Sequence, residues 1–313
     1  MNNKTVYKIL VTDGLNENAL SVVRNLGNKH SIGVSSHSPL FFSPAAVSKY
    51  TCKRHRIKSV KSDLDGYASD LIGIIKEYEY DCIIPVSLLS YLAVSKYKDE
   101  FQMITHVAIS AWDNMQMAYN RDCAIGLANR EKIPTPRSYF LHDGSIINSI
   151  EKYPVVLKTS DYNNSLVKYC NSRKELEQEI IKGGGYRQGI IAQEYIKGFG
   201  CGYYGIYDKG KEIAYFLHRR ISEYPITGGS SAIAESYYDQ RLCDYGTRLC
   251  EALSWHGPIM IEFKYDHAHD DFKLIEINPK LWGSLDLTIA AGVAVPELLV
   301  NLALGKRNLK QSR

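Results

Sequence analysis

Two stretches near the C-terminal end decide the fold: GPIMIEFKY at residues 257–265 and FKLIEIN at residues 272–278. Each has the length of a β-strand and is rich in β-branched and aromatic residues. The polar run 266–271 between them is typical of a turn. Together they predict a β-hairpin.

The register of this hairpin brings two carboxylates together. If the turn pairs Lys264 with Leu274, alternation along each strand places Glu262 directly opposite Glu276 on one face. The next pair on that face is Met260 with Asn278. The opposite face then carries a plain apolar core stripe: Ile261, Phe263, Ile275 and Ile277.

Two opposed glutamates need a neutralising partner, because like charges about 5 Å apart across a strand pair destabilise the sheet. Carboxylate and amide oxygens without a nearby His or Cys suit Mg²⁺ or Mn²⁺ that carries waters and phosphate oxygens. We therefore predict Glu262, Glu276 and Asn278 as metal ligands. Two alternatives stay open: a solvated strand face softened by Lys264, and the carboxylate pair of a retaining glycosidase.

Two earlier segments suggest a phosphorylated ligand. Lys158 ends the apolar strand 155–157 and can carry a positive charge into a cleft, although a lysine that snorkels to the surface has the same pattern. Segment 193–198 ends a strand at a polar and aromatic step, where backbone groups can meet the edge of an adenine.

An arginine pair precedes a glycine-rich loop. His218-Arg219-Arg220 is followed by a loop at 227–231 that contains Gly228, Gly229 and Ser230. Guanidinium groups and exposed loop amides both suit a phosphoryl group or a carboxylate. We predict a loop that closes over an anion; the alternative is a surface arginine pair beside an ordinary turn.

The first third of the chain alternates short apolar runs with amphipathic stretches, which predicts a small parallel sheet built from βαβ units. Strands are expected at 6–12, 31–35, 82–86 and 107–109, and helices at 17–26 and 67–78. The first turn, 12–17, lacks the glycines that let a dinucleotide pyrophosphate approach the backbone, so this layer is not expected to bind NAD.

A stiff connector, Pro134-Thr135-Pro136, follows a helix expected at 120–131 and separates this layer from the rest. The remainder has the pattern of an antiparallel α+β half. Its expected strands are 155–158, 190–195, 202–207 and 212–218 besides the hairpin, and its expected helices are 172–182, 238–253 and a last one from Pro296 to Gly305.

Composition excludes several classes of protein. Hydrophobic residues at 45% and charged residues at 23% are typical of a folded chain in water. A net charge of +4 is too small to indicate nucleic-acid binding. Seven cysteines without a CxxC pair indicate neither a zinc site nor a disulfide framework. With no targeting or membrane segment in sight, we expect a cytoplasmic protein.

Taken in order, these features resemble the ATP-grasp superfamily, specifically the carbamoyl-phosphate-synthase-like carboxylate–amine ligases. The resemblance is strongest from 193 to 305 and includes Glu262 with the block Glu276-Ile277-Asn278-Pro279-Lys280. It implies a parallel α/β domain at 1–118 before a two-subdomain ATP-grasp fold, with a small lid at 119–190 and a large subdomain with the metal site at 191–313.

The resemblance also implies roles for individual residues. Arg220 and Lys280 would serve the transferred phosphoryl group, and Gly228, Gly229 and Ser230 would belong to a closing loop over the substrate. The ATP-binding set would be Arg121, Lys158, Gln193, Glu194, Tyr195 and Ile196, and the metal set Glu262, Glu276 and Asn278.

Four positions depart from the family pattern. Arg121 stands where a lysine is common, Lys280 replaces an arginine, and Gly200 lies near a position that often carries a ribose-binding acid. The loop 159–165 after Lys158 lacks the expected glycines.

The sequence thus predicts an ATP- and Mg²⁺-dependent ligase, with Mn²⁺ as the other candidate metal, that activates a carboxylate as an acyl phosphate and joins it to an amine. An amino acid or small peptide is the expected substrate class. A regulatory ATP-binding subunit without turnover and a kinase that uses the same site are the rival functions. We expect small-molecule partners and a homodimer, with neither nucleic acid nor membrane.

Overall fold

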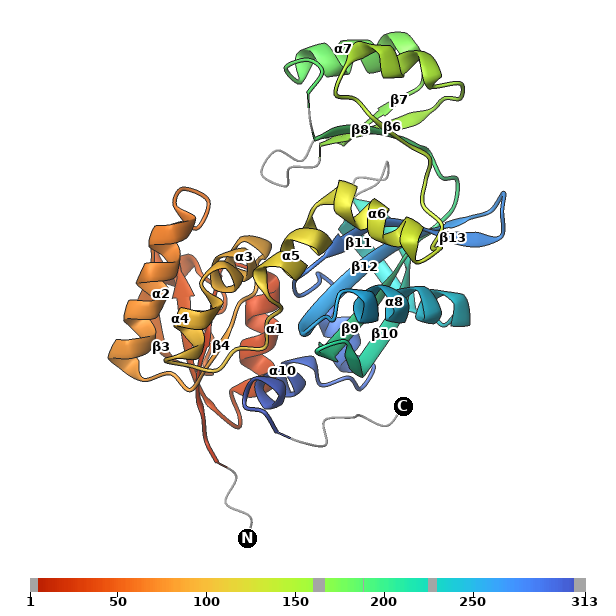
Figure 1. The fold of residues 1–313 in the computed structure, drawn as a ribbon. Coiled ribbons are helices and arrows are strands. Elements are labelled where there is room, and N and C mark those ends of the chain that lie inside the picture. Colours follow the sequence, from red (N-terminus) through yellow and green to blue (C-terminus); the bar gives the residue numbers. More distant parts are fainter. Residues whose placement is uncertain (1–4, 160–166, 188, 225–229, 307–313) are drawn as a thin grey trace.

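The computed structural model describes residues 5–159, 167–187, 189–224 and 230–306. It contains a parallel sheet and two antiparallel sheets in three parts of the molecule (Figure 1). The mixed α/β and α+β class predicted from the sequence is confirmed. Each helix in the described part of the chain is too short or too polar to span a bilayer.

The N-terminal part is a four-stranded parallel sheet in the order β3-β2-β1-β4. Its strands are β1 (Lys8–Val11), β2 (Ser31–Ser36), β3 (Thr51–Arg56) and β4 (Cys82–Ile84). Its helices are α1 (Glu17–Leu26), α2 (Leu64–Tyr78), α3 (Leu88–Lys96) and α4 (Lys98–Gln102), with a 3₁₀ turn η1 (Leu40–Phe42).

One expectation for this sheet was wrong, and one strand was missed. Residues 107–109 form no strand; only a single bridge joins His106 to Cys82. The fourth strand is β3 instead, at the sheet edge. Its sequence TCKRHR is mostly exposed and charged, as suits an edge strand, so it lacks the apolar pattern that a buried strand shows.

Helices α5 (Trp112–Tyr119) and α6 (Arg121–Arg130) lead to the lid, a sheet in the order β5-β8-β6-β7. Its strands are β5 (Ser138–Phe140), β6 (Val155–Thr159), β7 (Val167–Cys170) and β8 (Ile190–Glu194), with η2 (Gly144–Ser149) and α7 (Arg173–Lys182). The lid has its own core, which includes Leu157, Leu176 and Ile180, whereas the other two parts share one continuous core.

The third part is a five-stranded sheet in the order β11-β10-β9-β12-β13. Its strands are β9 (Gly200–Asp208), β10 (Lys211–Tyr224), β11 (Ser230–Ser236), β12 (Gly257–Asp266) and β13 (Asp271–Asn278). Its helices are α8 (Gln240–Ala252), α9 (Leu285–Ala290) and α10 (Val295–Ala303). Strand β10 extends past the expected end at 218, so Arg220 lies on a strand and not in a loop.

The hairpin β12–β13 has the predicted pairs at its functional end and a different register beyond it. Glu262 pairs with Glu276, but a β-bulge follows, so that Phe263 pairs with Leu274 and Lys264 with Lys273. Ile275 is the extra residue of the bulge. The expected core position of Ile275 was therefore wrong: Leu274 is buried there, and Ile275 lines a cavity.

Candidate active site

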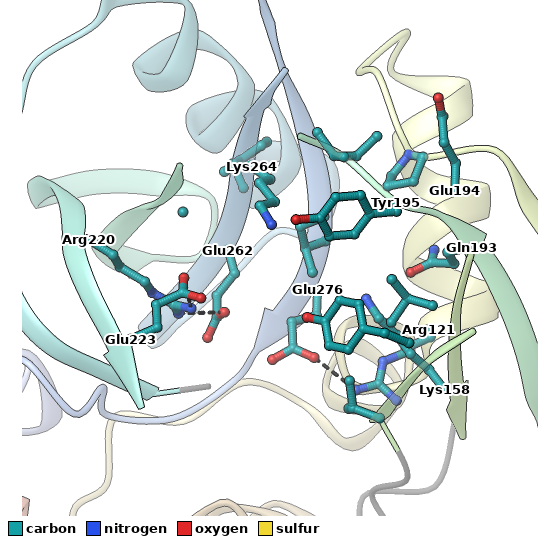
Figure 2. Close-up of a pocket in the computed structure, with 18 residues that line it drawn as sticks. Arg121, Lys158, Gln193, Glu194, Tyr195, Arg220, Glu223, Glu262, Lys264 and Glu276 are labelled. Atoms are coloured by element: carbon teal, nitrogen blue, oxygen red, sulfur yellow. Dashed lines mark hydrogen bonds and ion pairs between the residues drawn. The ribbon is translucent and has the colours of Figure 1, made fainter. Parts of the chain in front are cut away.

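Glu262 and Glu276 lie side by side on the open face of the large sheet, as predicted (Figure 2). Each carboxylate meets a different arginine. Arg220 Nη2 lies 2.6 Å from Glu262 Oε2, and Arg121 Nη2 lies 2.9 Å from Glu276 Oε2. The Asn278 amide nitrogen donates to both remaining oxygens, at 2.9 Å from Glu276 Oε1 and 3.3 Å from Glu262 Oε1.

The two carboxyl groups differ in acidity. Burial raises the pKa of Glu262, and the neighbouring Glu276 charge adds to this effect beyond what Arg220 offsets. Burial also acts to raise the pKa of Glu276, but Arg121 and Asn278 outweigh it and the pKa is lowered. Glu276 is thus the firmly ionised member of the pair.

These residues fit a hard divalent cation. All candidate donors are oxygens, and no cluster of three His, Cys, Asp or Glu side chains occurs in the described part of the chain. Two carboxylates and one amide leave room for water and phosphate oxygens, which is the coordination that Mg²⁺ favours in nucleotide sites. In their present arrangement, the Asn278 amide and the two arginines offset the carboxylate charges.

Lys158 is brought to the same place from the lid. It lies on β6 with 9% of its surface exposed, and its side-chain amine forms no ion pair or hydrogen bond with another described residue. Burial lowers the pKa of the Lys158 amine to about 8, and the Arg121 charge lowers it while Glu276 raises it. A desolvated, unpaired ammonium at a cavity wall is prepared to meet an anion.

Segment 193–196 leaves the lid beside this site. The buried Gln193 donates to Ser138 Oγ at 2.9 Å, and the Glu194 backbone amide donates to the Arg137 carbonyl at 2.8 Å. The Glu194 amide is therefore unavailable to a base. Tyr195 and Ile196 follow the strand, and neither backbone amide has a backbone partner among the described residues.

The two carboxylates, Arg121, Arg220, Lys158 and segment 193–196 line one cavity of about 280 Å³ (Figure 2). Tyr195 is 37% exposed, and Lys264 Nζ lies 5.0 Å from its ring centroid. Several lining residues had not been singled out as ligand contacts, among them Val156, Val167, Tyr169, Glu223 and Lys264. Alternation along the lid strands could have found the first three, since Val156 and Lys158 lie on one face, as do Val167 and Tyr169.

Arg220 is held between two carboxylates. Its Nη1 lies 3.4 Å from Glu223 Oε1, on the side away from Glu262. A Cβ atom on Gly200 would lie 2.7 Å from Glu223 Oε1 and 3.0 Å from Arg220 Cδ, so a larger residue there would displace the Glu223 carboxylate from Arg220. The expected pairing of two guanidinium groups was wrong, because strand alternation turns Arg219 to Glu235 on the neighbouring strand.

The remaining predicted residues contribute less. Lys280 lies close enough for its charge to lower the pKa of Glu262, but it does not line the cavity. Ser230 begins β11, whereas Gly228 and Gly229 lie outside the described residues, as does the loop 160–165.

A second cavity, of about 730 Å³, lies at the carboxyl ends of β1 and β4. This is the point where the strand order of a parallel sheet reverses, the usual ligand position in such sheets. Both oxygens of Asp13 are occupied by donors from Thr12, Ser87 and Ser90. The polar lining also includes Asn16, His37 and Lys61, beside the apolar Leu15, Val60, Leu88 and Leu89.

Residues 205–313 match the family model described as ATP-grasp in the biosynthetic pathway with Ter operon. The matched segment contains both carboxylates, Asn278 and Arg220. By this match, residues 205–313 carry an ATP-grasp domain. No curated protein matches this chain in sequence.

Solved structures share the fold of this chain over nearly its whole length. The L-amino acid ligase from Bacillus licheniformis has a TM-score of 0.72 at 16% identity, over 96% of this chain and 75% of that one. Biotin carboxylase from Campylobacter jejuni, in complex with β,γ-ATP, has a TM-score of 0.72 at 17% identity, over 100% of this chain and 73% of that one. N5-carboxyaminoimidazole ribonucleotide synthetase from Thermotoga maritima has a TM-score of 0.69 at 14% identity, over 96% of this chain and 76% of that one. At these identities the likeness shows the fold.

Proposed function

We propose that the protein is an ATP- and Mg²⁺-dependent ligase that joins a carboxylate to an amine. The observation that carries this proposal is the convergence of Glu262, Glu276, Lys158, Arg121 and Arg220 on one cavity. Carboxylates for a metal and cations for phosphate, without a protein nucleophile, suit phosphoryl transfer by positioning and charge neutralisation. The resemblance to carboxylate–amine ligases and the similar solved structures support the carboxylate as phosphate acceptor.

The reaction would proceed in two steps. A substrate carboxylate oxygen attacks the γ-phosphorus of ATP, which forms an acyl phosphate and releases ADP. The amine nitrogen then attacks the acyl carbon, phosphate leaves, and the amine loses a proton. Bound at Glu262, Glu276 and Asn278, Mg²⁺ (Mn²⁺ is the other candidate) would neutralise phosphate charge.

The chain's own residues have separable roles in this scheme. Lys158 would contact the phosphates from the lid side, and Arg121 would do so beside Glu276. Arg220, fixed by Glu262 and Glu223, would steady the transferred phosphoryl group, with Lys280 behind it. Tyr195 and Ile196 would bind the adenine, while Gln193 and Glu194 shape this segment. Gly228, Gly229 and Ser230 would serve the substrate.

We place a substrate at the second cavity. Since the acceptor oxygens of Asp13 are already occupied, the polar groups left to a ligand include the donors of Asn16, His37 and Lys61, beside the hydroxyls of Ser59 and Ser87. These donors suit a carboxylate, and the leucines beside them suit an apolar group. An amino acid or short peptide that offers its amine to the acyl phosphate has this chemistry.

The decisive experiment is ADP release from MgATP over a panel of amino acids and short peptides. A ligase releases ADP only when carboxylate and amine are both present and yields a condensed product by mass. Tight ATP binding without ADP release would instead support a regulatory subunit, and a stable phosphorylated metabolite would support a kinase. The proposed homodimer and cytoplasmic location are tested by light scattering and cell fractionation.

A further inference from the structure

The hairpin β12–β13 holds both connections between the lid and the rest of the molecule. The Leu274 amide donates to the Pro134 carbonyl at 2.8 Å on the first connection. The Tyr265 amide donates to the Phe199 carbonyl at 3.0 Å, and the His267 amide to the Lys197 carbonyl at 3.3 Å, on the second. Since the lid has a separate core, these connections fix its position relative to the carboxylates (Figure 1).

Lys273 adds a side-chain link at the same point. Its Nζ lies 3.1 Å from Glu194 Oε2 on the lid strand β8 and 3.0 Å from Asp266 Oδ2 on β12. Glu194 Oε2 also accepts the Arg137 backbone amide at 3.2 Å, so one carboxylate joins both connections. The side chains of Lys273 and Asp266 are 11% and 5% exposed and that of Glu194 is 41% exposed, so water screens the pair with Glu194 more than the pair with Asp266.

Asp266 gives this link a rigid base. It is buried and also accepts the Ala268 amide at 3.0 Å and His269 Nδ1 at 2.7 Å. Burial acts to raise the pKa of Asp266, but these donors and Lys273 outweigh it and hold the pKa at about 2. Asp266 therefore stays anionic and keeps Lys273 in place.

This arrangement places two like charges opposite each other in the hairpin. Lys264 and Lys273 are direct cross-strand partners, and like charges in that position destabilise a strand pair. Each lysine nevertheless reaches the same segment of the chain, since Lys264 lies over the Tyr195 ring while Lys273 binds Glu194. Two lysines directed at one two-residue segment indicate that the position of this segment matters.

We propose that Lys273 is a positioning residue for nucleotide binding. It acts through Glu194 and holds segment 194–196 at a fixed place relative to Glu262 and Glu276, so that base and phosphates bind together. This inference rests on the proposed function, in which that segment binds adenine.

The test compares two ligands with and without a base. MgATP and magnesium tripolyphosphate are titrated by calorimetry into wild type, Lys273→Met, Lys273→Arg and the exposed control Lys211→Met. We expect Lys273→Met to weaken MgATP binding about tenfold, the size of coupling found between contacting charged groups. Tripolyphosphate binding should stay within about twofold, Lys273→Arg should recover most of the loss, and Lys211→Met should match wild type.

Each contrary result has its own meaning. If Lys273→Met binds MgATP as tightly as wild type, or loses ATP and tripolyphosphate equally, the positioning role is wrong while the ligase proposal stands. If wild type binds no MgATP, both are wrong. A second test is the Glu194→Gln background, where Lys273→Met should cause little further loss; full additivity would contradict the link through Glu194.

Discussion

Glu262 and Glu276 face each other across the hairpin, yet each is paired with an arginine from a different element: Glu262 with Arg220 of β10, and Glu276 with Arg121 of α6. The carboxylates are thus neutralised from opposite sides, and the space between them is bridged by one amide. Under the proposed function, a divalent cation would take the place of the arginines at the carboxylates, and the arginines would then meet the phosphates.

Removal of either carboxylate charge should abolish turnover. We expect Glu276→Gln and Glu262→Gln each to lower ADP release about 10²–10³-fold, the usual effect of removing a charged group from a transition-state site. The loss should be larger for Glu276, the firmly ionised member. Magnesium titration of initial rates measures it, and the exposed Glu251→Gln is the matched control. Retention of normal magnesium-dependent activity by Glu276→Gln would exclude it from the metal site.

Arg121 should not tolerate a lysine. The guanidinium group of Arg121 reaches Glu276 while most of its side chain is buried, and a lysine keeps the charge without the planar fork. We expect Arg121→Lys to lower kcat/KM for ATP about tenfold. Steady-state kinetics at saturating substrate checks this. Full activity in Arg121→Lys would mean that charge alone suffices there.

The functional end of the hairpin was predictable from sequence because strand alternation is local. The pairing of Glu262 with Glu276 follows from the length of the turn and from the two-residue alternation of side chains along a strand. The bulge at Ile275 was not predictable in this way, since an isoleucine fits either face. A tertiary contact favours the bulge: the Leu274 amide donates a hydrogen bond to the Pro134 carbonyl, which lies far away in the sequence.

Residues from other sheets were harder to place. Lys158 and Arg220 attracted attention by their neighbours in sequence, but the place of Glu223 beside Arg220 becomes visible only in the assembled structure. The resemblance to a family predicted the order of the domains along the chain, and local periodicity predicted which side chains share a face of a strand. Neither predicts how far apart residues on different sheets lie.

The second cavity should affect a substrate and not ATP. We expect Lys61→Gln to raise KM for the amino-acid substrate about threefold to tenfold, as loss of a partly exposed charge to a carboxylate does, with KM for ATP unchanged. Lys58→Gln on the same loop, outside this cavity, is the control. A change in KM for ATP alone would place the substrate elsewhere.

ATP binding should weaken in mild alkali. Since burial lowers the pKa of the Lys158 amine from 10.5 to about 8, the free enzyme loses this positive charge as pH rises through about 8. We expect kcat/KM for ATP to fall above that pH, because a neutral amine offsets no phosphate charge. Lys158→Arg should show no such decline. A flat wild-type profile from pH 7 to 9 would contradict a role for this amine.

The buried Lys158 amine should lower the stability of the protein when no ATP is bound. Its protonated amine is disfavoured in the folded state, and a lowering from 10.5 to about 8 corresponds to about 3 kcal/mol of unfolding free energy at pH 7. This penalty is complete below pH 8 and is relieved between pH 8 and 10.5, where the unfolded chain binds the proton and the folded one does not.

Lys158→Met, which keeps the side-chain length without the charge, should therefore raise the melting temperature at pH 7 while it removes ATP binding. Thermal denaturation with and without MgATP separates the two effects, and the gain in stability should shrink as pH rises to 10. If Lys158→Met is less stable than wild type at pH 7, the amine has a stabilising partner in solution and is not held ready for phosphate.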